Sequence, residues 1–519
     1  MKFHSFFRIH YLFAFLFVNQ ALFSQNTPPQ SFNRELEKQV DIGKPKLAGA
    51  VQFDSATQTY TLKGAGYNVW FNRDEFSFVP TKIYGDFLLT TNLKFSDTTG
   101  HSHKKAGWMI RESLDESAAH VSALIHKDGL TSMQARPLRG SFMRDPQDEI
   151  RAPKKRADII QLERSGKQFI MRIANAGEPL QVVAVKEYAE MPDTVYAGLF
   201  VASHDAEKLE EAQFWNVRID KPVPDNYSTG KSGFIGCRLE ILDVFTGQRK
   251  VIHESKGRFE APNWMPDGKR LLFNANGYLY TIPVEGGDTV RLNTGKADRN
   301  NNDHGISFNG KMLAISSHRT GLPGGGSSVY VLPLTGGEPT LLTEQTPSYW
   351  HGWSPDGNNV LYVGMRDGKN YNIYKKAVKG GEETALSANK DHHVDGPEYS
   401  PDGKYIYYNG SSSGTMQIWR MKPDGSGKEQ ITFDENNNWF PHISPDGKWI
   451  AFITFPPTIN PSDHPSYKRV RLMLMPASGG VPRVIAHLYG GQGTINVPSW
   501  SPDSKRLAFV SNSKRYEEK

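Results

Sequence analysis

Short apolar runs recur along the chain, separated by Gly, Pro, Asp and Asn, with the length and alternation of β-strands. In the first half, examples are residues 59–62, 87–93 and 169–173. In the second half, apolar runs such as 269–273 and 448–452 each follow a tight polar turn. The pattern predicts an all-β protein, in which residues 46–221 form a β-sandwich and residues 235–519 form a repetitive second unit.

One turn sequence recurs through the second half. Its copies read Ser-Pro-Asp-Gly or a close variant, and they centre on Pro266, Phe308, Pro355, Pro401, Pro445 and Pro502. Pro presets φ at the second position of a type I turn, Asp bonds locally at the third, and Gly ends the turn. These centres lie 42 to 57 residues apart, and a period of about 40 to 45 residues with strand-like flanks is typical of propeller blades. The six copies therefore predict a six-bladed β-propeller.

The last repeat contains two strands, up to Asn512. Two strand-like segments without a turn copy of their own, 238–242 and 249–252, precede the first repeat and are joined by a turn at Thr246-Gly247. We therefore predict that strands from both ends of the unit complete one shared blade. That closure would remove an exposed sheet edge.

The Ser-Pro-Asp-Gly-Lys phrase, the apolar strand after it and the Gly-Gly hairpins resemble the six-bladed propeller of the TolB family over about residues 235–512. Relatives of that family include envelope adaptors, peptidase propellers and sugar lyases, so the resemblance implies a fold and leaves the function open. Residues 85–90, 105–113 and 197–201 resemble a bacterial group of concanavalin-like jelly-roll domains that are often attached to carbohydrate-active proteins. Within them, we expect 107–113 (Gly-Trp-Met-Ile-Arg-Glu-Ser) to be sheet framework.

The N-terminal residues 1–25 have the features of a secretory signal peptide, with Lys2 and Arg8 before an apolar run at 11–18. No Cys follows that run, so we expect no lipoprotein anchor. No later stretch is apolar enough to span a bilayer, so we expect no transmembrane segment. Residues 26–45 would be a leader and 222–234 a linker stiffened by prolines. These features predict a secreted or periplasmic protein.

Cysteine content and charge narrow the class further. Cys237 is the single cysteine, so no intramolecular disulfide is available. The net charge of +6 is small for 519 residues. The main basic cluster, 154–156, is expected to be a solvated loop, so we expect no nucleic-acid partner. We expect a monomer.

The repeat also indicates where a site would lie. Three residues before the Ser of each turn, where the innermost strand begins, four blades have Pro, whereas two neighbouring blades have His304 and His351, each followed by Gly. Local rules tend to be broken at functional sites. We predict that His304, His351 and Tyr349 are catalytic, and that His304, His351 and His442 hold a divalent metal such as Mn, Ca or Zn, although no cofactor is certain. The alternative is that the histidines are channel polar groups bonded to water and backbone.

Further polar and aromatic side chains near this channel mouth are expected to bind a ligand. They are Trp350, Asp395, Glu398, Trp439, His442, Arg319, Arg366, Gln492 and Asn496. Aromatic faces stack on sugar rings, and Arg pairs with carboxylate or sulfate groups. Packing between blades is the alternative for the aromatic residues, and an ordinary turn is the alternative for Arg366.

These observations favour a secreted or periplasmic carbohydrate-recognition protein whose partner is an extracellular glycan. One alternative is a propeller lyase or hydrolase for uronic-acid glycans, in which a His or Tyr removes the proton α to the carboxylate. Another is a TolB-like envelope adaptor that binds a protein. The sequence contains no nucleophile elbow, no His-Glu-x-x-His spacing and no phosphate loop that would favour another enzyme class.

Overall fold

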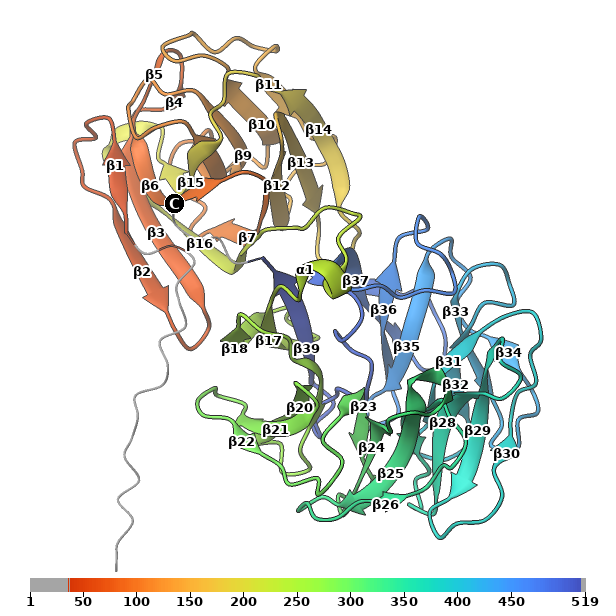
Figure 1. Cartoon of the computed structure of the whole chain (residues 1–519). Helices are drawn as coiled ribbons and strands as arrows, with labels where there is room; N and C mark the ends of the chain where they lie inside the picture. The colour runs from red at the N-terminus through yellow and green to blue at the C-terminus, as the bar shows by residue number, and fades with distance from the viewer. Residues whose placement is uncertain (1–35, 37, 515–519) are drawn as a thin grey trace, which may run out of the picture.

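The computed structural model describes residue 36 and residues 38–514, and these residues form an all-β protein (Figure 1). Its two short helical turns are α1 (Thr229–Ser232) and η1 (Pro323–Gly326). No helix in this part of the chain is long and apolar enough to cross a membrane. The expected signal peptide, 1–25, lies outside the described residues.

Two seven-stranded antiparallel sheets form the first unit. The first sheet contains, in spatial order, β1 (Val40–Ile42), β6 (Phe76–Tyr84), β15 (Thr194–Ala202), β8 (Lys105–Arg111), β9 (His120–His126), β10 (Thr131–Arg136) and β11 (Glu149–Arg151). The second contains β14 (Gln181–Glu187), β13 (Gln168–Ala174), β12 (Ile159–Ser165), β7 (Phe87–Phe95), β16 (Asp205–Asp220), β3 (Thr59–Gly66) and β2 (Ala50–Asp54). A small hairpin joins β4 (Val69–Trp70) to β5 (Arg73–Asp74).

The core of this unit lies between the two sheets. Trp108 on β8 is fully buried in one cluster with Phe87 on β7 and Leu162 on β12. Each such side chain contributes about 1.5–3 kcal/mol when it is buried. Arg111, from the same segment as Trp108, forms a buried ion pair with Asp74 at 2.8 Å. The predicted β-sandwich is confirmed, and residues 107–113 lie within its framework.

The second unit is a ring of blades around a central channel (Figure 1). The first blade contains β19 (Glu260–Trp264), β20 (Arg270–Ala275), β21 (Tyr278–Pro283) and β22 (Val290–Arg291). The second contains β23 (Asn300–Ile306), β24 (Met312–His318), β25 (Ser327–Pro333) and β26 (Thr340–Leu341). The third contains β27 (Ser348–Trp353), β28 (Asn359–Met365), β29 (Tyr371–Ala377) and β30 (Thr384–Ala385). The fourth contains β31 (Val394–Tyr399), β32 (Ile406–Gly410), β33 (Gln417–Met421) and β34 (Glu429–Gln430). The fifth contains β35 (Asn437–Ile443), β36 (Trp449–Phe455), β37 (Lys468–Pro476) and β38 (Arg483–Gly490).

The sixth blade combines both ends of the propeller sequence. β39 (Arg506–Ser513) pairs with β17 (Gly236–Asp243), which pairs with β18 (Arg249–Ser255). On the inner side, Trp500 bridges Leu507. The predicted six blades and their shared closure are confirmed.

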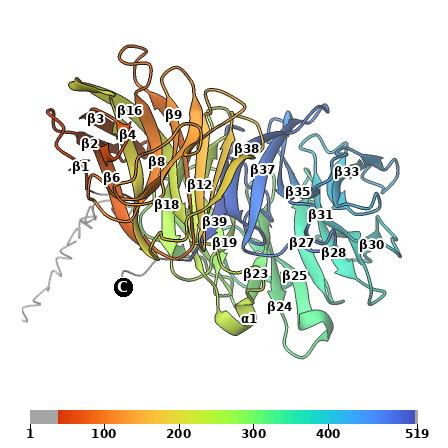
Figure 2. The same ribbon diagram turned by 90° about the horizontal axis from the view of Figure 1, so that it is seen from above.

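The closing blade also contacts the sandwich, which lies to one side of the propeller in both views (Figures 1 and 2). The fully buried carboxylate of Glu240 on β17 accepts hydrogen bonds from Arg218 of β16 at 2.7 Å and from Arg249 of β18 at 2.7 Å. Gln58 of the sandwich exchanges two hydrogen bonds with the backbone of Val251, at 2.8 and 2.9 Å. The two units are therefore joined by buried polar contacts at the blade that closes the ring.

The repeated turns lie at the far ends of the innermost strands. In the fourth blade, Ser400 donates to the Asp402 carboxylate at 2.7 Å, and that carboxylate accepts from the backbone N–H of Lys404 at 3.1 Å. Gly403 has φ +71°, a conformation that glycine adopts at low cost. The turns therefore fix one end of each inner strand and leave the other end available for a site.

Candidate functional site

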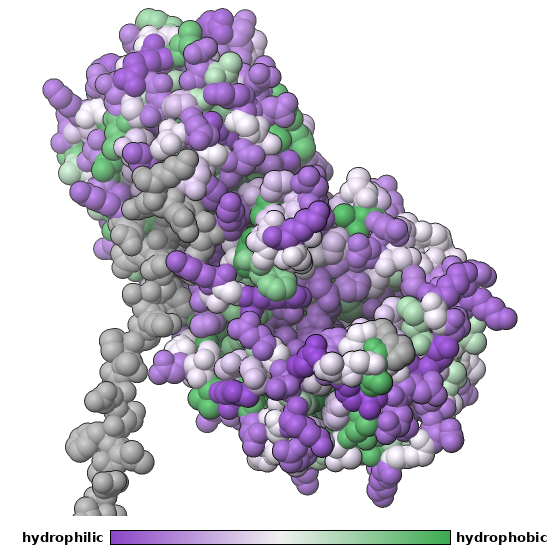
Figure 3. Space-filling model, in the orientation of Figure 1, coloured by the Kyte–Doolittle hydropathy of each residue, from purple (hydrophilic) through white to green (hydrophobic). Residues whose placement is uncertain are grey.

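A cavity of about 550 Å³ opens where the innermost strands begin, in the middle of the propeller. In Figure 3 this part of the propeller face is recessed and mainly polar. Its walls come from the starts of inner strands, from the β20–β21 hairpin, and from the segment between β36 and β37. The cavity therefore lies at the opposite ends of the strands from the Ser-Pro-Asp-Gly turns.

One repeat position supplies much of the wall. It lies two residues before the Pro or His position, and its six occupants are Glu260, Asn302, Tyr349, Asp395, Trp439 and Asn496. All of them except Trp439 line the cavity. In the first five blades, the pairing of the inner strand shifts register within a few residues of this position. A bulge of this kind bends a strand and re-aims its side chains, so the repeat brings polar groups from separate blades to one place.

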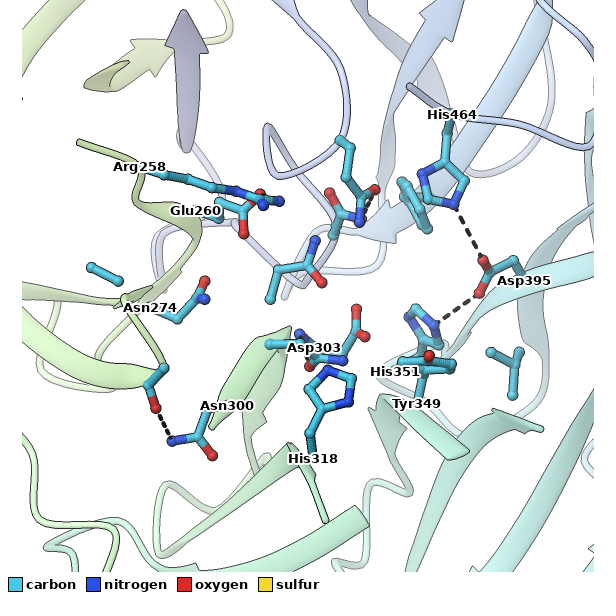
Figure 4. Close-up of a pocket in the computed structure, with 18 of the residues that line it drawn as sticks. Arg258, Glu260, Asn274, Asn300, Asp303, His318, Tyr349, His351, Asp395 and His464 are labelled. Atoms are coloured by element: carbon cyan, nitrogen blue, oxygen red, sulfur yellow. Dashed lines mark hydrogen bonds and ion pairs between the residues drawn. The ribbon is translucent and has the colours of Figure 1, made fainter. Parts of the chain in front are cut away.

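His351 and Asp395 form an ion pair at one side of the cavity (Figure 4). His351 Nε2 lies 2.8 Å from Asp395 Oδ1, and His464 Nε2 lies 3.9 Å from Asp395 Oδ2. Burial acts to lower the pKa of His351, but the adjacent carboxylates of Asp395 and Asp303 outweigh it and raise that pKa. Burial acts to raise the pKa of Asp395, whereas His351 lowers it, and the net pKa is lowered. One carboxylate thus faces two imidazoles.

Asp303 is a buried carboxyl group in the same wall. Burial raises its pKa to about 7; His351 opposes this rise, and the carboxylates of Asp395 and Glu260 add to it. Burial also raises the pKa of Glu260, which is paired with Arg258. A carboxyl group that titrates near neutral pH can either donate or accept a proton, so the cavity contains groups suited to proton transfer.

Several buried polar atoms in the cavity wall have no hydrogen-bond partner among the residues that the structure describes. They are Asn274 Oδ1, Asn300 Oδ1, Asn302 Nδ2 and His464 Nδ1. Most buried polar groups are paired, and an unpaired one costs about 1–3 kcal/mol. These atoms therefore include both acceptors and donors that a polar ligand or water can satisfy. Tyr349, Tyr371 and Phe440 add aromatic surface.

The structure places the predicted site residues in two groups. His351, Tyr349, Asp395, Gln492 and Asn496 line the cavity together. His304 lies outside its lining and is fully buried, and burial lowers the pKa of its imidazole to about 3. Of the three predicted metal ligands, His351 alone faces the cavity. Within residues 36 and 38–514, no three His, Cys, Asp or Glu side chains are arranged to hold a metal.

The remaining predicted ligand-binding residues make contacts inside the propeller. His442 Nδ1 lies 2.7 Å from Glu398, and its Nε2 lies 2.7 Å from the backbone oxygen of Ile495. Arg366 Nε donates to Glu383 at 2.8 Å, and Arg319 Nε donates to Ser328 at 3.1 Å. None of these side chains, and neither Trp350 nor Trp439, lines the cavity.

Close packing explains the Gly that follows each channel histidine. A Cβ atom on Gly305 would lie 2.0 Å from the ring of Trp350, and one on Gly352 would lie 2.8 Å from the carbonyl oxygen of Pro397. In both cases the next blade occupies the space. Trp350 therefore packs between blades, which is the alternative that the sequence left open for it.

Some cavity residues were absent from the predicted set. They include Arg258, Glu260, Asn274, Asn302, His318 and His464. Glu260 and Asn302 could have been found from the same repeat alignment, by comparing the residues two places before the Pro or His position. His464 comes from the segment between β36 and β37, which is longer than the corresponding segments of the other complete blades.

Comparisons with known proteins give the family. The family described as "PD40: TolB beta propeller domain" matches residues 235–394 and 350–458. An uncharacterized protein of Agrobacterium fabrum, Atu1656, is 44% identical over 284 residues, which cover 54% of this chain and 94% of that protein. The chain belongs to the TolB β-propeller family. The predicted TolB resemblance is therefore confirmed.

Two further relatives are consistent with this family. A solved Agrobacterium tumefaciens structure named after TolB superimposes with a TM-score of 0.51 at 44% identity, covering 54% of this chain and 99% of that one. The Tol-Pal system protein TolB of Francisella tularensis is 25% identical over 273 residues, which cover 50% of this chain. The chain spans 59% of the length of that TolB protein.

Proposed function

We propose that the protein recognises carbohydrate by binding a saccharide unit in the propeller cavity. The observation that carries this proposal is the set of unpaired, buried amide atoms from Asn274, Asn300 and Asn302 around a cavity of about 550 Å³. Small-molecule sites commonly have volumes of about 300–1,000 Å³.

The chemistry of the wall matches a polyhydroxylated ligand. Each sugar hydroxyl can donate one hydrogen bond and accept others, so it can pair with the Oδ1 of Asn274 and with the Nδ2 of Asn302. The rings of Tyr349, Tyr371 and Phe440 can cover the apolar C–H face of a sugar. A site built to hydrogen-bond hydroxyls discriminates strongly against ligands that lack them, because its buried polar groups would stay unpaired.

The test is a glycan array probed with the full-length protein. Wild type is expected to retain a defined set of saccharides. The Asn274→Ala, Asn302→Ala double variant is expected to lose them and to keep its thermal stability, since each substitution removes a buried atom that has no partner in the described part of the chain. Asn358→Ala, at an exposed turn on the opposite face, is the matched control. If no saccharide is retained by wild type, or if the double variant binds like wild type, the proposal fails.

A second candidate is an envelope adaptor in a secreted or periplasmic setting. The observation in its favour is the match to the Tol-Pal system protein TolB. An adaptor would form a complex of fixed stoichiometry with one envelope protein. Chemical cross-linking of the exported full-length chain in intact cells, followed by mass spectrometry, would identify that partner. Re-formation of the complex from purified components supports the adaptor, and failure to re-form it counts against it.

A further inference from the structure

A cluster of four histidines lies in the sandwich, separate from the residues of the propeller cavity. Its members are His101, His103, His126 and His204. His101 and His103 precede β8, His126 ends β9, and His204 follows β15. The sheet explains why they meet.

Strands β15, β8 and β9 are neighbours, and Ala202, Lys105 and His126 form one row across them. Because neighbouring strands are antiparallel, the segment before β8 lies at the same end of the strands as the last residues of β9 and β15. Residues far apart in the sequence are thereby brought to one end of the sandwich.

The rings are close enough to share one ligand. The Nδ1 atoms of His103 and His126 lie 3.3 Å apart. The ring centroids of His101 and His204 are 4.2 Å apart, and those of His103 and His204 are 5.7 Å apart. Two imidazole nitrogens bound tetrahedrally to Zn²⁺ at about 2.0–2.1 Å are separated by about 3.3 Å, so the observed Nδ1 pair already has the spacing of two ligands on one ion.

Other ring nitrogens in the cluster have no partner within residues 36 and 38–514. Nε2 of His126 and Nδ1 of His204 are buried without a hydrogen bond. A ring nitrogen without a hydrogen-bond partner is available to bind a metal ion.

The two lysines that follow His103 in the sequence have polar partners of their own. Lys104 Nζ is paired with Glu210 at 2.6 Å and with Asp97 at 3.1 Å. Lys105 Nζ donates to Gln134 at 3.1 Å. Lys104 is therefore neutralised by carboxylates, whereas the charge of Lys105 acts on His126 and His204.

We propose that His101, His103, His126 and His204 form a binding site for a divalent transition metal. A set of imidazole ligands suits Zn²⁺, Ni²⁺ or Cu²⁺, whereas Ca²⁺ and Mg²⁺ prefer oxygen ligands. Among the described residues no three ligating side chains surround one point, so binding requires a ring to turn. His101 and His103 are exposed in the segment before β8, where their side chains have room to do so. The bound metal would tie that segment to the ends of β9 and β15.

The test is calorimetric titration of Zn²⁺ and, separately, Cu²⁺ into untagged, chelator-treated full-length protein. We expect saturable binding by wild type, and at least a tenfold loss of affinity in His103→Ala and in the His103→Ala, His126→Ala double variant. Because His126 is buried, the single substitution of exposed His103 guards against loss through misfolding. The His392→Ala, His393→Ala variant, which removes an adjacent histidine pair of the propeller, is the matched control and should bind like wild type.

A second readout identifies the ligands directly. Electron paramagnetic resonance of the Cu²⁺-loaded protein should show hyperfine coupling to imidazole nitrogen that is reduced in His103→Ala. Binding of neither ion, or equal affinity in wild type and both histidine variants, would overturn the proposal. Loss of affinity confined to the His392, His393 variant would overturn it as well, because the metal would then sit in the propeller.

Discussion

Replacing Asp303 with Asn should make the protein more stable at alkaline pH. Asp303 is buried in the cavity wall, and burial raises its pKa from 3.8 to about 7. A carboxyl whose pKa is raised by folding holds its proton more tightly in the folded state than in the unfolded chain. Its contribution to stability is therefore fully present below about pH 4 and is lost as the pH rises through 7.

The magnitude follows from the two pKa values of Asp303. At about 1.4 kcal/mol per pKa unit, the difference between 3.8 and about 7 corresponds to about 4 kcal/mol of unfolding free energy. The amide that replaces this carboxyl group would remain neutral at every pH. The Asp303→Asn variant should therefore gain up to about 4 kcal/mol over wild type at pH 8, and close to nothing at pH 4.

The assay is urea unfolding of wild type and Asp303→Asn at pH 4 and pH 8, followed by tryptophan fluorescence. The control is Asp298→Asn, an exposed carboxyl in the segment just before β23. Equal midpoints for wild type and Asp303→Asn at pH 8, or a less stable variant there, would refute the reasoning. A gain at pH 8 would show that the cavity holds a carboxyl group that destabilises the fold, as expected of a group kept for function.

Further predictions concern the domain contact, the blade packing and the chemistry of the cavity. Glu240→Ala should destabilise the protein by about 3–5 kcal/mol in urea unfolding, because it leaves Arg218 and Arg249 buried without their shared carboxylate; exposed Glu285→Ala should have little effect. Gly305→Ala should lower the unfolding midpoint by the equivalent of about 1–3 kcal/mol, since its Cβ would lie 2.0 Å from Trp350; Gly257→Ala, whose nearest atom would be 3.6 Å away, should not. If the cavity only binds its ligand, uronic-acid polysaccharides should show no new ultraviolet absorbance on incubation with the protein; a rise that is lost in Tyr349→Phe would establish the lyase alternative.

The propeller was predictable because its signals are local. Each turn is specified by a few adjacent residues, as Ser400, Asp402 and Gly403 illustrate, and the copies of the turn fix the number of blades. The shared sixth blade followed from counting strands at the two ends of the repeat. The identity of the residues that face the cavity depends instead on strand bulges and on contacts between distant residues.

In the first five blades the inner strand has a bulge near the residues that face the cavity, and a repeat pattern does not reveal a bulge. We compared the Pro or His position, whereas the wall is formed two residues earlier, at Asn302 rather than His304. Where His-Gly replaces Pro, the two Gly residues allow close packing against Trp350 and Pro397. Of the two His residues, His351 lines the cavity. His464 reaches Asp395 from the segment between β36 and β37, a contact between distant residues that no local pattern specifies.

The central claim is that the propeller cavity binds a saccharide. Its most direct test is calorimetric titration of the array-selected saccharide into full-length wild type, the Asn274→Ala, Asn302→Ala double variant and the Asn358→Ala control. The account predicts one saturable site per chain in wild type and the control, and no measurable binding in the cavity variant. Equal affinity in all three proteins would contradict it, because the saccharide would then bind outside the cavity.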